Sequence, residues 1–385
     1  MHFELSKEHQ LLRETTRKFV QSELVPLSLQ IEETKKIPES AIQKVREMGY
    51  CGITIPEEYG GMGMDTVSHL IIQEELGWAH DCFNYLISGN NGIGAMGIVY
   101  EGTETQKKKY LPELASGKKL AAFALTEPNA GSDAQSIETT ATKKGDQWVL
   151  NGRKHFITRA EMSDVFTVMA ANDRSKKAKG GITAFIVERG MPGFTVGRHQ
   201  PSMGSDVVKQ CELIFEDCLV PAANVIGEVG QGFRIAMKVL NSGRLSLAAR
   251  ALGQMKYCQD KAVEYAKQRV QFGEPIANKQ LIQAMIADNE VDIFSVESML
   301  YPSAWRKDQG KNVNRECAIC KLYASEALAR VADRSIQIHG GMGYMVETGI
   351  ERVYRDARAM RLYEGTSEIQ RTIIARAAIE EGRNW

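Results

Sequence analysis

The sequence has no excess of charge of either sign, because 48 Lys and Arg residues balance 48 Asp and Glu residues. Nucleic-acid binders usually carry a basic excess, so we expect no nucleic-acid partner. Long apolar runs are also missing: a membrane span needs about 20 consecutive apolar residues. With a mean hydropathy of −0.29 as well, we expect no membrane association. A hydrophobic content of 43% without net charge argues against a disordered chain.

Cysteine is scarce and scattered. The 7 Cys residues are an odd number and form no disulfide framework. The pair Cys317 and Cys320 lacks the second pair that a zinc site needs, so we interpret both as small residues on a helix face and expect no metal. The first residues show neither a signal peptide nor an acid-poor transit peptide. We therefore expect a cytoplasmic protein of bacterial type, with a processed mitochondrial matrix protein as the alternative.

Nucleotide-binding motifs of the common kinds are absent. The sequence contains no Walker A motif and no G-x-G-x-x-G between a strand and a helix. The runs Gly60-Gly61-Met-Gly63 and Gly340-Gly341-Met-Gly343 lack that context and by themselves predict turns. This pattern argues against a nicotinamide cofactor held in a Rossmann fold.

The chain divides into three parts by its periodicity. Residues 1–119 predict an N-terminal α-helical domain, in which Ser6 caps the first helix and Pro26 interrupts it. Residues 120–229 predict a middle antiparallel β domain, and residues 230–385 a C-terminal four-helix bundle. The fold class is therefore α+β, mostly α.

The expected elements follow from apolar spacing and turn residues. Turns are predicted at Lys144-Gly145-Asp146 and at Asn151-Gly152. Further N-terminal helices are expected after Pro38, over 65–79 and over 105–114. Strands are expected over 120–125, 147–150, 154–158, 165–171, 182–187 and 212–215. Bundle helices are expected over 233–270, 279–308, 313–339 and 367–381.

One irregular segment carries the strongest motif. Thr126-Glu-Pro-Asn-Ala-Gly-Ser-Asp133 follows a predicted strand and offers hydroxyl and backbone donors. The string closely resembles the signature of the acyl-CoA dehydrogenase family. Other segments agree in family order: Ile55–Gly61, Lys154–Thr158, Phe215–Pro221, Gly230–Phe233, Arg269–Ile276, Gln337–Gly341, Arg355-Asp356 and Tyr363–Arg371.

The resemblance implies the acyl-CoA dehydrogenase fold and a reaction. The family oxidises acyl-CoA thioesters to 2,3-enoyl-CoA with FAD and passes the electrons to an electron-transfer flavoprotein. Its catalytic base falls on Glu364, which would remove the α-proton while the β-hydride goes to flavin N5. In some subclasses the base stands at the position of Gly243, which cannot serve here. We expect Ser367 to cap the following helix together with Gln370.

The resemblance also assigns binding residues. Those implied for FAD are Thr126, Ser132, Phe156, Thr158, Arg269, Phe272, Gln337, Gly340, Gly341, Thr366 and Glu368. Arg269, Phe272, Gln337, Gly340 and Gly341 would come from the neighbouring subunit of a homotetramer, the usual state of the family. Those implied for the acyl-CoA substrate are Ser132, Asn241, Arg244, Tyr363 and Gly365. Arg244 has a surface arginine as its alternative, and we expect a structural role for His339.

Two departures from the family pattern stand out. Arg159 occupies a position where Asn or Ser is usual; it could tune the flavin or the acyl cleft, but we favour a side chain that points to solvent. The helix expected below the acyl group contains Asn84 and also Asn90 and Asn91, and the last two are unusual for a pocket built only for alkyl tails. Asn at position 84 disfavours a decarboxylating glutaryl-CoA activity, because those members carry Arg there.

Three functions remain open beside the dehydrogenase, and the acyl group itself is not determined. An enoyl-CoA reductase would run the reaction in reverse with the same residues. An oxidase is disfavoured by the short chain. A non-catalytic CoA-ester-binding protein is disfavoured because Glu364 and the FAD set are retained.

Overall fold

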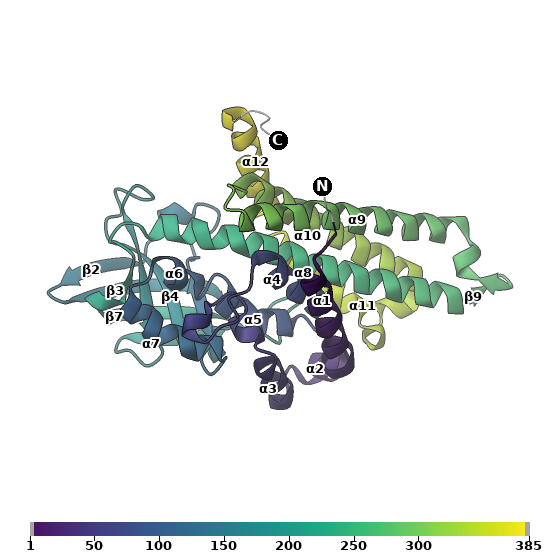
Figure 1. The fold of residues 1–385 in the computed structure, drawn as a ribbon, viewed down its shortest axis with the longest axis horizontal. Coiled ribbons are helices and arrows are strands. Elements are labelled where there is room, and N and C mark those ends of the chain that lie inside the picture. The colour runs from purple at the N-terminus through teal and green to yellow at the C-terminus, as the bar shows by residue number, and fades with distance from the viewer. Residues whose placement is uncertain (1–3, 382–385) are drawn as a thin grey trace.

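The computed structural model describes residues 4–381 and runs from helices to a sheet and back to helices (Figure 1). The boundaries at residues 119 and 229 stay a prediction. The helices before the sheet are α1 (Lys7–Phe19), α2 (Ser28–Thr34), α3 (Glu39–Glu47), α4 (Thr66–Leu76), α5 (Cys82–Asn91), α6 (Met96–Glu101) and α7 (Glu104–Ala115). Helix α6 was not predicted.

The first helix begins and ends as the sequence predicts. The Ser6 side chain accepts a hydrogen bond from the backbone N–H of His9 at 3.2 Å, which caps α1. The regular helix ends at Phe19, ahead of Pro26, and π and 3₁₀ turns follow at Val20–Leu24 and Val25–Leu27. Proline has no N–H to continue the helical ladder, so the break at Pro26 is confirmed.

The middle of the chain forms an 8-stranded sheet in the order β6-β7-β3-β2-β4-β5-β8, with β1 paired to β4. The strands are β1 (Ala121–Ala124), β2 (Thr140–Lys144), β3 (Gln147–Thr158), β4 (Val165–Ala171), β5 (Ile182–Glu188), β6 (Phe194–His199), β7 (Gln210–Pro221) and β8 (Val225–Ile226). Most pairs are antiparallel, as expected, but β4 pairs in parallel with β1 and β2. Strands β2, β6 and β8 were not predicted.

One predicted turn is wrong. Asn151 and Gly152 lie inside β3, which pairs with β7 on both sides of a bulge at this point. Gly152 has φ 147°, and a Cβ there would lie 2.6 Å from Oγ1 of Thr139, so the strand itself requires glycine. The other predicted turn is confirmed: Gly145 has φ 63° and joins β2 to β3.

Long helices make up the last part of the chain. They are α8 (Gly232–Gln268), α9 (Gln280–Asp308), α10 (Asn314–His339), α11 (Ile350–Met360) and α12 (Ser367–Glu381), with the short strands β9 (Val270–Gln271) and β10 (Glu274–Pro275) between α8 and α9. Helix α11 was not predicted. In Figure 1 α8 runs from the sheet to the opposite end of the molecule, where β9 lies.

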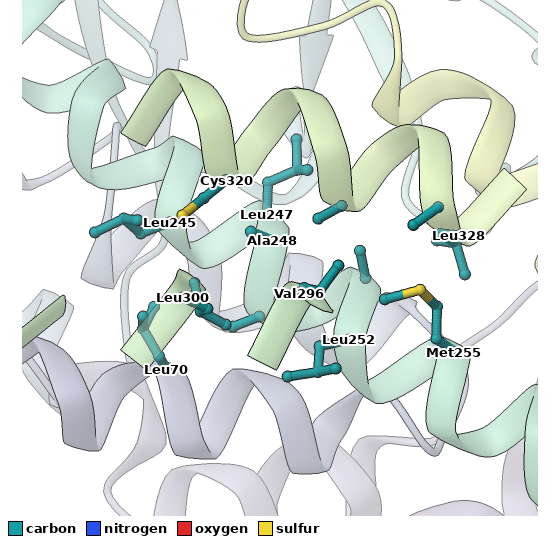
Figure 2. Packing of buried hydrophobic residues seen from close by; sticks show 14 of the residues in the cluster. Leu70, Leu245, Leu247, Ala248, Leu252, Met255, Val296, Leu300, Cys320 and Leu328 are labelled. Atoms are coloured by element: carbon teal, nitrogen blue, oxygen red, sulfur yellow. The ribbon is translucent and has the colours of Figure 1, made fainter. Parts of the chain in front are cut away.

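The largest helical core lies where α8 passes between α4, α9 and α10 (Figure 2). Leu70, Leu245 and Leu300 are fully buried there, and each such side chain contributes roughly 2 kcal/mol. Cys317 and Cys320 both lie in this core, which confirms both as packing residues. Gly253 allows the closest approach, because a Cβ there would lie 1.9 Å from the carbonyl oxygen of Glu74 on α4.

Candidate active site

The segment between α11 and α12 holds Glu364 in a left-handed backbone conformation. Glu364 has φ 54°, a region that costs a residue other than glycine about 1–3 kcal/mol. The side-chain amide of Gln370 donates to the carbonyl oxygens of Glu364 and Gly365 at 3.0 and 3.1 Å. Nζ of Lys321 donates to the Gly365 carbonyl at 2.6 Å. Helices α10 and α12 therefore fix the backbone that carries the Glu364 side chain.

The cap of α12 differs from the prediction. Ser367 is the first helical residue, and the cap is Thr366, whose Oγ1 accepts from the N–H of Ile369 at 3.3 Å. Ser367 instead donates to Oε1 of Glu326 at 2.7 Å. The cap therefore lies one residue earlier than predicted, and the Gln370 amide bonds the carbonyls ahead of the helix.

The Glu364 carboxylate lies against α8 at Gly243. A Cβ built on Gly243 would lie 2.5 Å from Oε2 of Glu364, so a larger residue would displace the carboxylate. Oε2 is buried and has no hydrogen-bond partner within residues 4–381. An unpartnered carboxylate oxygen keeps its lone pairs for a proton supplied by a bound molecule.

Burial and nearby cations act on Glu364 in opposite directions. Burial raises the pKa of Glu364, and the charges of Arg250, Arg244 and Lys321 partly offset the rise. Burial also lowers the pKa of Lys321 to about 8. A carboxyl group whose pKa is raised is a stronger base once it is ionised, which suits it for taking a weakly acidic proton.

Arg244 lies beside this carboxylate and is buried, with 6% of its surface exposed. The surface alternative for this arginine is therefore wrong. Its Nη1 donates to Oδ1 of Asn241 at 2.6 Å, and Nδ2 of Asn241 donates to Oδ1 of Asn314 at 2.6 Å. Asn241 thus orients Arg244 through its amide oxygen, without the charge that an aspartate would supply.

A buried ion pair supports the loop that carries Thr126 and Ser132. Nζ of Lys154 lies 2.6 Å from Oε1 of Glu127 and donates to the Leu125 carbonyl at 3.0 Å. The Glu127 carboxylate also accepts the backbone N–H of Thr139 at 3.0 Å. Burial lowers the pKa of Lys154 to about 8. This support holds the loop in shape while Ser132 stays exposed.

The end of strand β3 presents Phe156 and Thr158 near the same loop. The N–H of His155 donates to the Thr126 carbonyl at 2.9 Å, which joins the strand to the loop. Phe156 has φ 57° and leaves 62% of its surface exposed. An exposed aromatic ring in a strained backbone is suited to stacking on a planar ligand.

Arg159 does not point to solvent, contrary to the expectation. It is 2% exposed, and its guanidinium donates to the carbonyl oxygens of Tyr85, Leu86 and Ala121. A fourth bond reaches Oδ1 of Asn90 at 3.4 Å. Burial lowers the pKa of Arg159 to about 10. The long side chain lies inside because carbonyl groups of α5 and β1 satisfy its donors there.

Asn90 and Asn91 bond backbone groups of neighbouring segments. The Asn90 amide bonds the carbonyls of Leu114 and Lys119 and the N–H of Ala121. The Asn91 amide donates to the Tyr50 carbonyl at 2.7 Å. Asn84 is different: it is fully buried, and both its polar atoms lack hydrogen-bond partners among residues 4–381.

A second group of predicted residues lies around the end of α8. Arg269, Gly340 and Gly341 line a depression of about 480 Å³. A Cβ at either glycine would meet no atom within 4 Å, so the backbone there is open to a ligand.

The other residues near this end of α8 have different surroundings. Phe272 is 94% exposed and Gln337 is exposed. His339 stacks on Tyr265 at 4.5 Å, and its Nδ1 lies 2.7 Å from the Ser335 carbonyl oxygen.

The two groups of predicted residues do not meet within one chain. The rise of about 1.5 Å per residue puts Gly243 and Arg269 roughly 40 Å apart along α8. In Figure 1 the sheet and β9 lie at opposite ends of the molecule. Arg269 therefore lies far along α8 from Gly243, which contacts the Glu364 carboxylate in the same chain.

The sequence did not reveal several charged residues around Glu364. Arg250 and Lys321 are buried within helices, and Asp81, the partner of Arg250, is buried in the turn before α5. The sequence offers one indication of them: ionisable residues stand at positions where the helical spacing predicts buried apolar residues.

Comparison with known proteins gives matches to one family along nearly the whole chain. Models of the acyl-CoA dehydrogenase N-terminal, middle and C-terminal domains match residues 6–118, 122–218 and 230–379. A probable acyl-CoA dehydrogenase of Bacillus subtilis is 42% identical over 99% of this chain and 100% of its own length. This chain belongs to the acyl-CoA dehydrogenase family. The family, the fold class and the FAD cofactor expected from the sequence are thereby confirmed. The protein is an FAD-dependent oxidoreductase.

Other relatives of this acyl-CoA dehydrogenase family member differ in what they do. An acryloyl-CoA reductase (NADH) of Anaerotignum propionicum is 41% identical over 99% of this chain and 96% of its own length. A solved structure described as the electron transferring flavoprotein of Acidaminococcus fermentans is 40% identical, with a TM-score of 0.96. That match covers 99% of this chain and 100% of the other.

FAD fits these residues. The exposed rings of Phe156 and Phe272 offer faces for stacking, and the backbone at Gly340 and Gly341 is open to a ligand. Arg269 offers a cation to the two phosphates of FAD. Within residues 4–381 no group of three His, Cys, Asp or Glu side chains is arranged to hold a metal ion. No helix in that range is long and apolar enough to cross a membrane.

Proposed function

We propose that this protein removes two hydrogens from the α and β carbons of an acyl-CoA thioester and forms the 2,3-enoyl-CoA, with Glu364 as the base. The observation that carries the proposal is the Glu364 carboxylate itself. Its Oε2 is buried, lacks a partner among the described residues and lies against Gly243. Its pKa is raised by burial, which favours uptake of the α-proton of a thioester.

Other residues of the chain orient the substrate. Arg244, held by Asn241, would bind the polar CoA arm, and Ser132, Tyr363 and Gly365 would contact the thioester end. The rigid backbone at Glu364 and Gly365 supports this role, because a base must be held in place before the substrate arrives. FAD, when bound, supplies the acceptor for the hydride equivalent.

FAD would be shared between two subunits of a homotetramer. Thr126, Ser132, Phe156, Thr158, Thr366 and Glu368 of one chain would hold its flavin side. Arg269, Phe272, Gln337, Gly340 and Gly341 of the neighbour would hold its pyrophosphate and adenosine side. The roughly 40 Å along α8 between Gly243, which contacts Glu364, and Arg269 supports this arrangement.

The electron acceptor proposed is an electron-transfer flavoprotein. The match to the Acidaminococcus fermentans structure supports it. The acyl group stays undetermined, and a cytoplasmic location remains a prediction.

An enoyl-CoA reductase is the second candidate, supported by the relative named acryloyl-CoA reductase (NADH). The same base and cofactor residues serve both directions. Reduction of an enoyl-CoA by NADH in the presence of an electron-transfer flavoprotein, faster than the oxidation of the saturated ester, would favour this candidate.

Anaerobic spectroscopy of the purified protein tests the proposal. We expect a yellow protein whose flavin bleaches on addition of a suitable thioester from a panel of short, medium, branched, aromatic and dicarboxylic CoA esters. Glu364→Gln should retain FAD and bind the ester but lose about three orders of magnitude in the rate of bleaching. Near-normal bleaching by this variant would exclude Glu364 as the base.

A further inference from the structure

A buried pair of opposite charges lies next to the proposed base and is not explained by the binding of FAD or CoA. Arg250 on α8 and Asp81, just before α5, are 5% and 2% exposed. Nε of Arg250 lies 3.2 Å from Oδ1 of Asp81. Burying such a pair is costly, and it contributes to stability only when its hydrogen bonds are well satisfied.

The hydrogen bonds of this pair are incomplete. Both Asp81 oxygens and Nε of Arg250 lack a well-aligned hydrogen bond among residues 4–381. The Arg250–Asp81 pair therefore contributes little to stability. Its place beside Glu364 indicates a role at the active site.

The free end of Arg250 reaches the residue that precedes the base. Its Nη2 donates to the Tyr363 hydroxyl and, at 3.2 Å, to the Tyr85 hydroxyl. The guanidinium carbon lies 4.3 Å from the centre of the Tyr85 ring and 5.9 Å from that of Tyr363. The two hydroxyl oxygens are 3.5 Å apart. Arg250 thus fixes Tyr363 from the side of α5 and α8.

We propose that Arg250, held by Asp81, is a positioning residue for Glu364: it anchors Tyr363 and sets the charge that the base experiences. The inference rests on the proposed function in that it takes Glu364 as the base. Arg250 occupies the same face of α8 as Gly243, because seven residues make nearly two full turns.

Several other charges face these groups. Arg244 on α8 and Lys321 on α10 act on Glu364 together with Arg250, and all three lower its pKa against the effect of burial. Asp356 and Arg352 of α11 lie near Asp81, and burial raises the pKa of Asp356 to about 7. Among these groups only Arg250 contacts both Asp81 and Tyr363. One substitution at Arg250 and another at Asp81 can therefore change the two charges of the pair one at a time.

Infrared difference titration of the whole protein tests the inference without substrate. The carboxylic-acid band of Glu364 is the one that disappears in Glu364→Gln. Arg250→Gln removes a cation and should move the titration of this band to higher pH by about 0.5–1 unit. Asp81→Asn leaves the charge of Arg250 uncompensated and should move it to lower pH by a similar amount.

A matched control is the Arg330–Asp292 pair of the bundle, 2.5 Å apart, which is not among the charges acting on Glu364. Arg330→Gln should leave the Glu364 band unmoved. Arg250→Lys keeps the charge and should titrate close to the native protein. If Arg250→Gln does not fold, Arg250→Met, which also removes the cation, takes its place.

Opposite shifts in the two variants support the inference, and equal or absent shifts overturn it. The pH dependence of flavin reduction by an acyl-CoA should move in the same directions. If the infrared shifts occur but no thioester reduces the flavin, the proposed function fails while the charge relationship stands. A purely structural role would lower the melting temperature in both variants without separating their titrations.

Discussion

The guanidinium of Arg159 fills the space that a side chain at Gly89 would need. A Cβ at Gly89 would lie 1.7 Å from Nη2 of Arg159 and 2.1 Å from the Ala121 carbonyl oxygen. The backbone of α5 can therefore approach both β1 and the end of β3, which carries Phe156 and Thr158. A single arginine thus connects the strand end proposed for the flavin with Tyr85, which contacts Tyr363 beside Glu364.

Replacement of Gly89 by alanine should destabilise the protein strongly. The added carbon would force Arg159 or the backbone of β1 to move, at a cost of about 3 kcal/mol. Thermal and urea unfolding measure the loss. Gly97→Ala on α6 is the control, because its Cβ would meet its nearest atom at 3.5 Å, an ordinary contact. Equal stability of the two variants would contradict the packing described.

A side chain at position 243 should impair catalysis without removing the cofactor. In Gly243→Ala the new methyl group would press on the Glu364 carboxylate, and we expect at least a tenfold fall in the rate of flavin reduction. The flavin content should stay at the native level. Ser246→Ala, one turn further along α8, should behave as the native protein does. An unchanged rate in Gly243→Ala would show that the carboxylate moves freely at this contact.

Glu364 should make the free energy of unfolding of the native protein fall as the pH rises. Glu364 has a pKa raised above 4.5 in the folded state. The folded protein therefore holds this proton more tightly than the unfolded chain, and the stabilisation present below the unfolded pKa is lost as the pH rises through the folded pKa.

Glutamine cannot ionise, so Glu364→Gln should escape this loss. Its melting temperature should exceed that of the native protein by a margin that grows as the pH rises above the usual pKa of a glutamate. Differential scanning calorimetry at several pH values measures this margin. A constant difference would mean that Glu364 titrates alike in both states.

Arg269 should matter for the cofactor and for assembly together. If its guanidinium neutralises the pyrophosphate of FAD held by a neighbouring subunit, Arg269→Ala should lose most of its flavin and shift toward smaller species. Absorbance and light scattering measure the two effects. Lys267→Ala, an exposed cation on the last turn of the same helix, is the control. Full flavin content in Arg269→Ala would remove the proposed contact.

Much of this protein could be predicted from its sequence because local rules decide it. The cap at Ser6, the turn at Gly145 and the four long helices of the bundle follow from side chains that act on their own neighbourhood. The family motifs further identified the fold and FAD. The turn predicted at Asn151 and Gly152 was wrong because the same residues serve a bulge inside a long strand, and the pairing partner decides which occurs.

What only the tertiary structure decided are the relationships between distant residues. The sequence alone gives no reason for Arg159 to lie inside the protein, since its partners are backbone carbonyls of α5 and β1. Arg244 and Arg250 of α8 and Lys321 of α10 act on Glu364, and only the packing of these helices around the segment before α12 brings the three charges to it. The sequence thus determined which groups are present and where helices begin, and the fold determined which charges face one another, because electrostatic coupling depends on distance and burial rather than on order along the chain.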